Sequence, residues 1–160
     1  MYNYRKMRRV KQEISRQECI EVLKNAPRGI LSMHGENGFP YSVPINQYYD
    51  EENGKLYFHG AKEGLKLDLL RENNKVCFTI IDEGYQIEGE WPMHFHSVIC
   101  LGTIHEVTDQ GSFINHLRKL GNKYYPSEED VDDLISKTIS RICLYEMDIE
   151  RMTGKHVKES

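Results

Sequence analysis

The stretch GILSMHGENGFPYSVPINQYYDEENGKLYFHGAKEGLK, residues 29–66, decides the fold of this 160-residue chain. Its apolar segments at 29–33, 41–46 and 55–60 are separated by HGENG and DEENG, which are rich in turn-forming residues. Between residues 41 and 46, Tyr, Val and Ile alternate with Ser, Pro and Asn, which is the period of a strand with one buried face. The stretch therefore predicts a hairpin followed by a third strand.

Helices and further strands are predicted on both sides of this stretch. Ser15 and Glu18 have the spacing of a capping box, and the apolar stripe that follows ends before Pro27. Residues 61–72 have helical spacing, with Ala61, Leu65 and Leu69 on one face. Downstream, the pattern predicts a strand buried on both faces at 76–81, a polar loop at 83–95, a strand at 97–107, two helices separated by Pro126 with Ser127 capping the second, a strand at 141–150, and a tail at 152–160.

This order of elements indicates the α+β class. Six strands with hairpin connections and few crossovers predict an antiparallel β-barrel with helices packed outside it. A doubly wound nucleotide-binding fold is disfavoured, because regular βαβ alternation and a glycine-rich first turn are both missing from the sequence. We expect one domain over residues 1–160, with flexible ends at 1–12 and 156–160.

The charge balance excludes some classes of partner. The 25 acidic and 21 basic residues give a formal charge of −4 and are mixed along the sequence, so binding to nucleic acid is not expected. No apolar run has the roughly 20 residues that cross a bilayer, and the N-terminal residues lack the apolar centre of a signal peptide. We therefore expect a cytoplasmic protein that does not enter the membrane.

Cysteine and histidine spacing gives no strong metal signal. The four cysteines are far apart, none forms a C-x-x-C pair, and all lie in apolar segments, which predicts buried thiols. His94 and His96 form an H-x-H that could bind metal with His105 as a third ligand, but no cysteine or carboxylate completes the set. No metal site is predicted.

Two local features are compatible with a bound ligand. The third strand leads directly into a helix through residues 58–66, where Gly60 and Gly64 allow close approach to the backbone and Lys66 could add a positive charge to free N–H groups. From these residues alone, an ordinary turn with a solvated lysine is the favoured interpretation. Pro44 interrupts a strand, which indicates an edge, a bulge or a ligand.

Four motifs together carry a resemblance to a known family. GFPYSVPIN (38–46), LYFHGAKEGLK (56–66), SVICLG (97–102) and TGK (153–155) occur in this order. In this the chain resembles the pyridoxamine 5'-phosphate oxidase-like FMN-binding split-barrel superfamily, and within it the Nim-type, nitroimidazole-resistance branch. The resemblance covers nearly the whole length, from the first helix to Lys155.

The resemblance implies a six-stranded antiparallel split β-barrel that forms a homodimer with FMN at its interface. It also implies electron transfer from NAD(P)H to a small acceptor, such as a nitroaromatic or a quinone. The phosphate would be bound by Lys66, and His59 would lie near the reactive face of the flavin as the candidate catalytic residue. The implied cofactor-binding residues are Ser42, Val43, Pro44, Ile45 and Asn46 at the ring edge, His59, Gly60 and Ala61 along the ribityl chain and phosphate, Lys66, and Ser97.

The sequence departs from the family pattern around residues 91–96. Many relatives have an arginine before S-V and a P-C pair in the preceding loop, whereas this chain has His96 and Trp91-Pro92-Met93. These departures affect the choice of substrate more than FMN binding. Trp91 is compatible with stacking on a substrate and with burial at a dimer interface.

Two other ligand classes remain open. One is a non-catalytic dimer that binds flavin or haem, for which an axial histidine on a mobile element is needed and His156 is the residue to test. The other is a deazaflavin-dependent reductase, for which the basic residues between Lys6 and Lys11 could bind an acidic tail.

Overall fold

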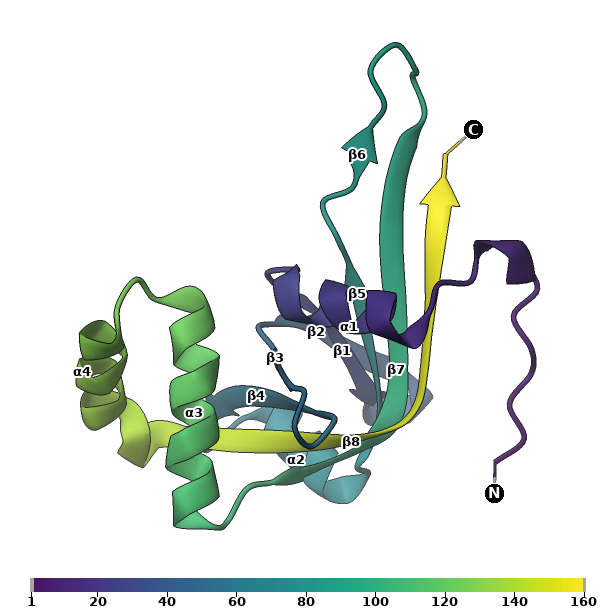
Figure 1. Ribbon diagram of the computed structural model, residues 1–160. Helices are drawn as coiled ribbons and strands as arrows, with labels where there is room; N and C mark the ends of the chain where they lie inside the picture. The colour runs from purple at the N-terminus through teal and green to yellow at the C-terminus, as the bar shows by residue number, and fades with distance from the viewer. Residues whose placement is uncertain (1, 160) are drawn as a thin grey trace.

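The computed structural model describes residues 2–159 and consists of one antiparallel sheet with α-helices around it (Figure 1). The strands are β1 (Gly29–His34), β2 (Pro40–Ile45), β3 (Tyr48–Asp50), β4 (Lys55–Ala61), β5 (Lys75–Ile81), β6 (Tyr85–Gln86), β7 (Met93–Glu106) and β8 (Ile142–Lys158). The α-helices are α1 (Arg16–Asn25), α2 (Leu65–Glu72), α3 (Gln110–Tyr124) and α4 (Glu128–Thr138), and short 3-10 helices cover Val10–Gln12, Glu36–Gly38 and Ile139–Arg141.

The sheet confirms the α+β class and the antiparallel split-barrel architecture. Its strand order is β2-β1-β5-β7-β8-β4-β3, with β6 paired to β7, and β1 and β2 form the predicted hairpin. The sheet has eight strands where six were predicted, because β3 and β6 are only three and two residues long and are too short for a periodic pattern. The two ends of the sheet, β2 and β3, do not pair, so the barrel stays open.

The two longest strands form a ribbon that extends beyond the barrel (Figure 1). β7 begins at Met93, four residues before the predicted start, and pairs with β8 as far as Lys158. The predicted tail at 152–160 is therefore wrong over residues 152–158, and His156–Lys158 belong to β8 rather than to a flexible end. Gly154, a residue type that favours turns, lies inside this strand.

The core lies inside the curled sheet and joins its two ends. Leu31 of β1, Ile45 of β2, Phe58 of β4 and Phe78 of β5 all belong to one buried cluster. The rings of Phe58 and Phe78 meet edge to face with centroids 5.1 Å apart. Tyr49 of β3 belongs to the same cluster, and because β2 and β3 both contribute to it, the two ends of the sheet border one interior.

The helices begin and end largely where the caps predict. Ser15 and Glu18 form the capping box of α1, and the Oγ of Ser127 accepts a hydrogen bond from the backbone N–H of Asp130 in α4. The helix predicted from Ala61 begins instead at Leu65, and Ala61 is the last residue of β4. No helix among residues 2–159 is long and apolar enough to cross a membrane.

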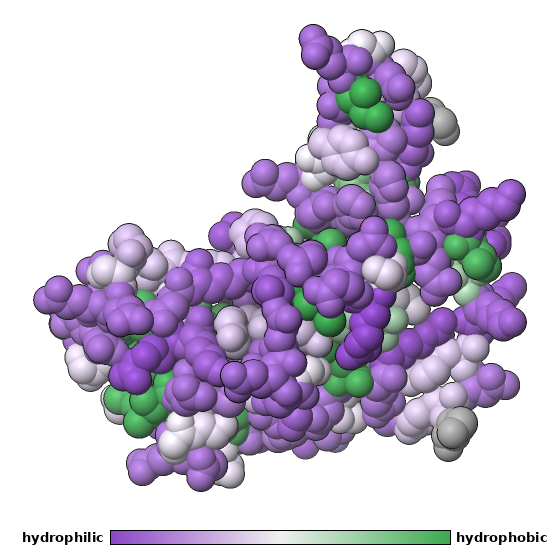
Figure 2. Space-filling model, viewed as in Figure 1, coloured by the Kyte–Doolittle hydropathy of each residue, from purple (hydrophilic) through white to green (hydrophobic). Residues whose placement is uncertain are grey.

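Part of the outer face of the sheet is apolar and uncovered. Ile30, Ile81 and Ile99 are 42 %, 55 % and 43 % exposed. The prediction that residues 76–81 are covered on both faces is wrong for this chain, since β5 alternates between buried and exposed positions. The side of the molecule seen in Figure 2 is mostly hydrophilic, with small separate apolar patches, one of them on the protruding ribbon.

Candidate functional site

The predicted binding strand β2 lies at one end of the sheet. It pairs with β1 alone, so its second backbone edge is not used by another strand among residues 2–159. Ser42 and Pro44 point outward and are exposed, whereas Val43 and Ile45 turn toward the core. Val43 and Ile45 can therefore offer a ligand only their main-chain groups. The position of Pro44 in an edge strand explains how the sheet tolerates the missing N–H donor.

The end of β2 is held in place by a residue that the motifs did not single out. Gln47 is completely buried, and its Nε2 donates hydrogen bonds to the carbonyl oxygens of Leu23 and Ala26 at 3.1 and 2.9 Å. Its own backbone carbonyl accepts from Lys123 Nζ at 3.0 Å and from the hydroxyl of Tyr124 at 3.0 Å. Through these bonds of Gln47, α1 and α3 also fix the position of Asn46, the residue directly before it.

The predicted phosphate turn connects β4 to α2. Gly64 caps α2 with φ of 123°, a conformation that favours glycine, and no side chain accepts from the first turn of the helix. β3 pairs with β4 only as far as Tyr57, so the edge of β4 from Phe58 to Ala61 is not covered by β3. Backbone N–H groups at the start of α2 and along this edge are therefore available to a ligand.

Lys66 lies directly over this turn. Its Nζ is 2.8 Å, and its Cε 3.1 Å, from the point where a Cβ would lie on Gly60, so only a glycine leaves room for the lysine there. Nζ is also 5.9 Å from the centroid of the Tyr145 ring. Among residues 2–159, no carboxylate pairs with Lys66 and no hydrogen bond to Nζ is made. Burial lowers the pKa of Lys66, which reflects the cost of holding an ammonium group there without an anion.

His59 shares the electrostatics of Lys66. Its side chain is exposed at one side of β4. Partial desolvation by the neighbouring chain atoms lowers the pKa of this exposed ring, and the positive charge of Lys66 lowers it further. The imidazole is therefore neutral at pH 7, with one nitrogen available to donate a hydrogen bond and the other to accept one.

Ser97 lies on the same outer face of the sheet as Pro44 of β2, although β1 and β5 lie between the two strands. Pro44 is paired with Ile30, Ile30 with Thr79, and Thr79 with Ile99, so one row of residues crosses four strands. Ser97 is two residues from Ile99 on the same face of β7. Three strand spacings of about 4.8 Å each separate β2 from β7.

Two cations accompany Ser97. Lys155 lies directly opposite it in β8. Ser97, Arg151 and Lys155 line a groove of about 350 Å³. The structure thus brings Gly60 and Lys66 together, with His59 close by, and it keeps Ser42–Ile45 together in β2 with Asn46 directly after its end. It does not bring Ser97 to either group within the chain.

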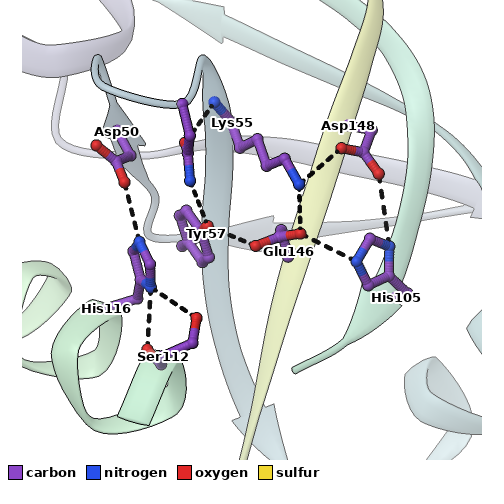
Figure 3. Close-up of polar contacts among 9 residues, drawn as sticks. Asp50, Lys55, Tyr57, His105, Ser112, His116, Glu146 and Asp148 are labelled. Atoms are coloured by element: carbon purple, nitrogen blue, oxygen red, sulfur yellow. Dashed lines mark hydrogen bonds and ion pairs between the residues drawn. The ribbon is translucent and has the colours of Figure 1, made fainter. Parts of the chain in front are cut away.

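A polar network behind β4 fixes the strand that carries His59 (Figure 3). His116 Nε2 and Asp50 Oδ2 are 2.9 Å apart and buried, and the His116 ring stacks on Tyr57 with centroids 3.9 Å apart. The Tyr57 hydroxyl donates to Glu146 Oε2 at 2.5 Å. Burial and Glu146 raise the pKa of Tyr57, so its hydroxyl stays protonated as a donor. The network ties β4 to α3 and β8.

The same network contains an acidic cluster that already holds a cation. His105, Glu146 and Asp148 have ligand atoms within 4.8 Å of one another. Lys55 Nζ lies 2.7 Å from Glu146 Oε1 and 3.1 Å from Asp148 Oδ1, as Figure 3 shows. Because Lys55 pairs with both carboxylates, this cluster is an ion-pair network within the protein.

The grouping of His94, His96 and His105, which the sequence allows but does not predict as a metal site, is not found among residues 2–159. His94 and His96 share one face of β7, but the histidine opposite them is His156 of β8, paired directly with His96. His94 Nδ1 and His156 Nε2 are 3.0 Å apart. Trp91, in the preceding loop, is 75 % exposed in the chain.

Comparisons with solved structures place the fold. A candidate 5-nitroimidazole antibiotic resistance protein from Bacteroides thetaiotaomicron is similar, with a TM-score of 0.76 at 22% identity over 92% of this chain and 87% of that one. An FAD-binding protein from Mesorhizobium loti has a TM-score of 0.66 at 22% identity over 91% and 97% of the two chains. An FAD and heme binding protein from Mycobacterium smegmatis has a TM-score of 0.73 at 18% identity over 94% and 74%. These likenesses show the fold.

The sequence itself also matches a family. No curated protein matches the chain. The family described as pyridoxamine 5'-phosphate oxidase (Pyridox_ox_2) matches residues 15–156, which include β2, the β4–α2 turn and almost all of the β7–β8 ribbon. The resemblance of the four motifs is thereby confirmed, and the chain belongs to the pyridoxamine 5'-phosphate oxidase family, with a structure like that of its nitroimidazole-resistance relatives.

Proposed function

We propose that this protein is an FMN-dependent oxidoreductase that transfers electrons from NAD(P)H to a small acceptor, such as a nitroaromatic compound or a quinone. The observation that carries the proposal is the ammonium group of Lys66, half-buried without a partner among residues 2–159 and resting over Gly60 at the start of α2. A phosphate there would meet a full positive charge and the N–H groups of an uncapped helix turn.

The residues around this turn fit FMN in further ways. The space over Gly60 would be filled by any Cβ, and the edges of β2 and β4 present main-chain donors and acceptors next to one shared core. Ser42–Asn46 would hold the edge of the flavin ring, and His59, Gly60 and Ala61 would lie along the ribityl chain. A flavin-binding fold is also supported by the names of two structural relatives, which are described as FAD-binding.

We propose further that two copies of the chain form the complete site. Ser97, with Lys155 and Arg151, lies on the outer face about three strand spacings from β2, which is too far for one chain to close around a flavin. The exposed Ile30, Ile81 and Ile99 surround this region and favour burial against a second copy. Each FMN would then contact β2 and the β4–α2 turn of one protomer and Ser97 of its partner.

Replacing Ile99 with lysine tests the dimer. A charge at the centre of the outer face would be desolvated in the interface, so we expect Ile99→Lys to weaken dimerisation and FMN binding together, each by more than about tenfold. Light scattering coupled to gel filtration and flavin fluorescence measure the two effects. Ile114→Lys, at a similarly exposed isoleucine on α3, should leave both unchanged. A wild-type monomer that retains FMN would contradict the dimeric site.

In this reading, FMN supplies the redox chemistry by accepting a hydride from the nicotinamide and passing electrons to the acceptor. The protein orients the partners and provides protons. His59, neutral at pH 7 and placed beside Lys66, is the proposed donor of a proton to the reduced acceptor or of a hydrogen bond that tunes the flavin. Because its pKa is lowered, the neutral His59 can donate a hydrogen bond, and it must first take up a proton from solvent before it can transfer one to the acceptor.

The visible spectrum with FMN and nicotinamide tests the function. We expect the purified protein to show flavin bands, alone or after FMN is added, and to bleach under anaerobic conditions with NADH or NADPH. Adding a nitroaromatic compound or a quinone should restore the oxidised spectrum. His59→Gln should keep the flavin bands and slow this reoxidation. A colourless protein that ignores FMN would overturn the flavin assignment, and bands that no nicotinamide bleaches would leave a flavin-binding protein without the proposed activity.

The haem alternative is less well supported. One relative is described as binding both FAD and heme. Haem binding needs an axial ligand on a mobile element. His156 instead lies in β8, opposite His96, with its Nε2 3.0 Å from Nδ1 of His94. The unpaired Lys66 favours a ligand that carries a phosphate. The same spectrum distinguishes the two, because bound haem would give an intense Soret band.

A further inference from the structure

We propose that His94, His96 and His156 form a binding site for a divalent transition metal ion, represented by Zn²⁺, at the base of the protruding ribbon. The site is separate from the flavin site and does not depend on the proposed function. Neutral imidazole nitrogens are donors that suit zinc, nickel and copper, and three histidines are a known zinc ligand set.

The strand geometry gathers the three rings on one face. His94 and His96 are two residues apart on β7 and therefore point to the same side. His156 lies directly opposite His96 in the antiparallel partner β8. Paired residues of this kind have Cβ atoms about 5 Å apart, and a diagonal neighbour such as His94 is within reach of a long side chain. An H-x-H with a third histidine across the ladder is a compact three-nitrogen set.

One of the observed distances is close to that of a metal site, whereas the ligand atoms of His96 lie farther away. His94 Nδ1 and His156 Nε2 are 3.0 Å apart. Two nitrogens that bind one zinc ion at about 2.05 Å in tetrahedral geometry are about 3.3 Å apart. The rings of His96 and His156 are stacked, with centroids 4.8 Å apart. A rotation of side chains, without movement of the strands, is therefore needed to bring the third nitrogen onto the same ion.

The surroundings of two of the rings fit a bound ion. His94 is only 6 % exposed, and the nitrogen that faces His156 is Nδ1, so Nδ1 would be its donor to the ion. His96 Nδ1 lies 2.7 Å from Asp82 Oδ2, and the backbone N–H of His96 donates to Asp82 Oδ1 at 2.8 Å. A carboxylate on one imidazole nitrogen orients the ring and leaves Nε2 as the metal donor, which is the usual outer support of a zinc-bound histidine.

Bound metal would connect β7, β8 and the turn that carries Asp82. Tyr85 of β6 stacks on His94 with ring centroids 4.9 Å apart, so the short β6–β7 hairpin packs against the same cluster. The sequence pattern missed the site because His156 is 60 residues away from His96. The nearer His105 lies in the Lys55 network instead.

Metal binding to the untagged, chelator-treated protein tests this site. We expect calorimetry with Zn²⁺ to show one ion per chain, and Co²⁺ to give the visible bands of a tetrahedral complex. His94→Gln and His156→Gln should each weaken binding by at least about a hundredfold, and Asp82→Asn by about tenfold. Zn²⁺ should raise the melting temperature of the wild type and have no effect on His156→Gln, whose half-buried position makes it the safer variant to fold.

Two control variants separate this site from other ligands. His105→Gln removes the histidine of the acidic cluster, and His34→Gln removes an exposed histidine elsewhere. Both should bind Zn²⁺ as the wild type does. The proposal is overturned if the wild type does not bind, if His94→Gln and His156→Gln bind normally, or if His105→Gln abolishes binding.

Discussion

Replacing Lys66 with alanine is expected to weaken FMN binding by between about tenfold and about a hundredfold while leaving the fold intact. A hydrogen bond to a charged partner contributes about 1.5 to 3 kcal/mol, and each 1.4 kcal/mol is a factor of ten in affinity. Lys66 has no ion pair within residues 2–159, and burial lowers its pKa. Removing it therefore takes away an unfavourable buried charge in the free protein and weakens only the complex with FMN. Titration of the flavin-free protein with FMN, followed by flavin fluorescence, measures the effect.

The same titration has a matched control and a clear contrary result. Lys137→Ala removes an equal charge from an exposed position on α4, where the lysine pairs with Asp133, and should leave FMN affinity unchanged. Riboflavin, which lacks the phosphate, should bind wild type and Lys66→Ala with similar affinity. If Lys66→Ala binds FMN as tightly as the wild type, Lys66 is not the phosphate ligand.

Replacing Gly102 with alanine should lower the free energy of unfolding by about 3 kcal/mol. A Cβ on Gly102 would lie 1.9 Å from the backbone oxygen of Asp148 and 3.0 Å from its carbonyl carbon, and a backbone group cannot rotate away. Gly102 sits at the β-bulge, where pairing passes from Leu101–Arg151 to Gly102–Ile149. Urea unfolding followed by circular dichroism measures the loss.

A second glycine provides the control for this substitution. Gly111 lies in the first turn of α3, where an added Cβ would meet only Asp109 Oδ2, at an ordinary 3.5 Å. Gly111→Ala should change stability by no more than about 1 kcal/mol, because alanine is the better helix former. Equal effects of the two substitutions would mean that the close approach at Gly102 does not constrain the ribbon.

The end of β8 shows why the sequence pattern alone was wrong there: the glycine at 154 is explained by a contact with residues far away in the chain. Gly154 suggests a turn, but it is a strand residue at which a Cβ would lie 2.5 Å from Cys19 Sγ and 2.7 Å from a side-chain carbon of Ile14. The glycine is needed because α1 packs closely on β8. Because no residue between 152 and 160 indicates this contact, the local pattern predicts a tail where the structure has the end of β8.

The sequence predicted the continuous segments of the candidate site, but not the residues whose roles depend on distant parts of the chain. Residues 38–46 and 56–66 are continuous motifs, and each forms a continuous piece of the structure in β2 and the β4–α2 turn. Gln47, which anchors β2, carries no local signal, because its role depends on α1 and α3 packing around it. The grouping of His156 with His96 was missed because it depends on the pairing of β7 with β8.

The sequence by itself determined the α+β class, the β1–β2 hairpin, the capped helices and the family, because periodicity, turn residues, caps and motifs act over a few neighbouring residues. Only the tertiary structure decided which edges of the sheet stay open, that Lys66 lies unpaired over Gly60, and that three histidines share one face of the ribbon. These features depend on strand order and register. They arise from contacts between residues far apart in the chain, and a shift of one residue in register would move every side chain to the other face.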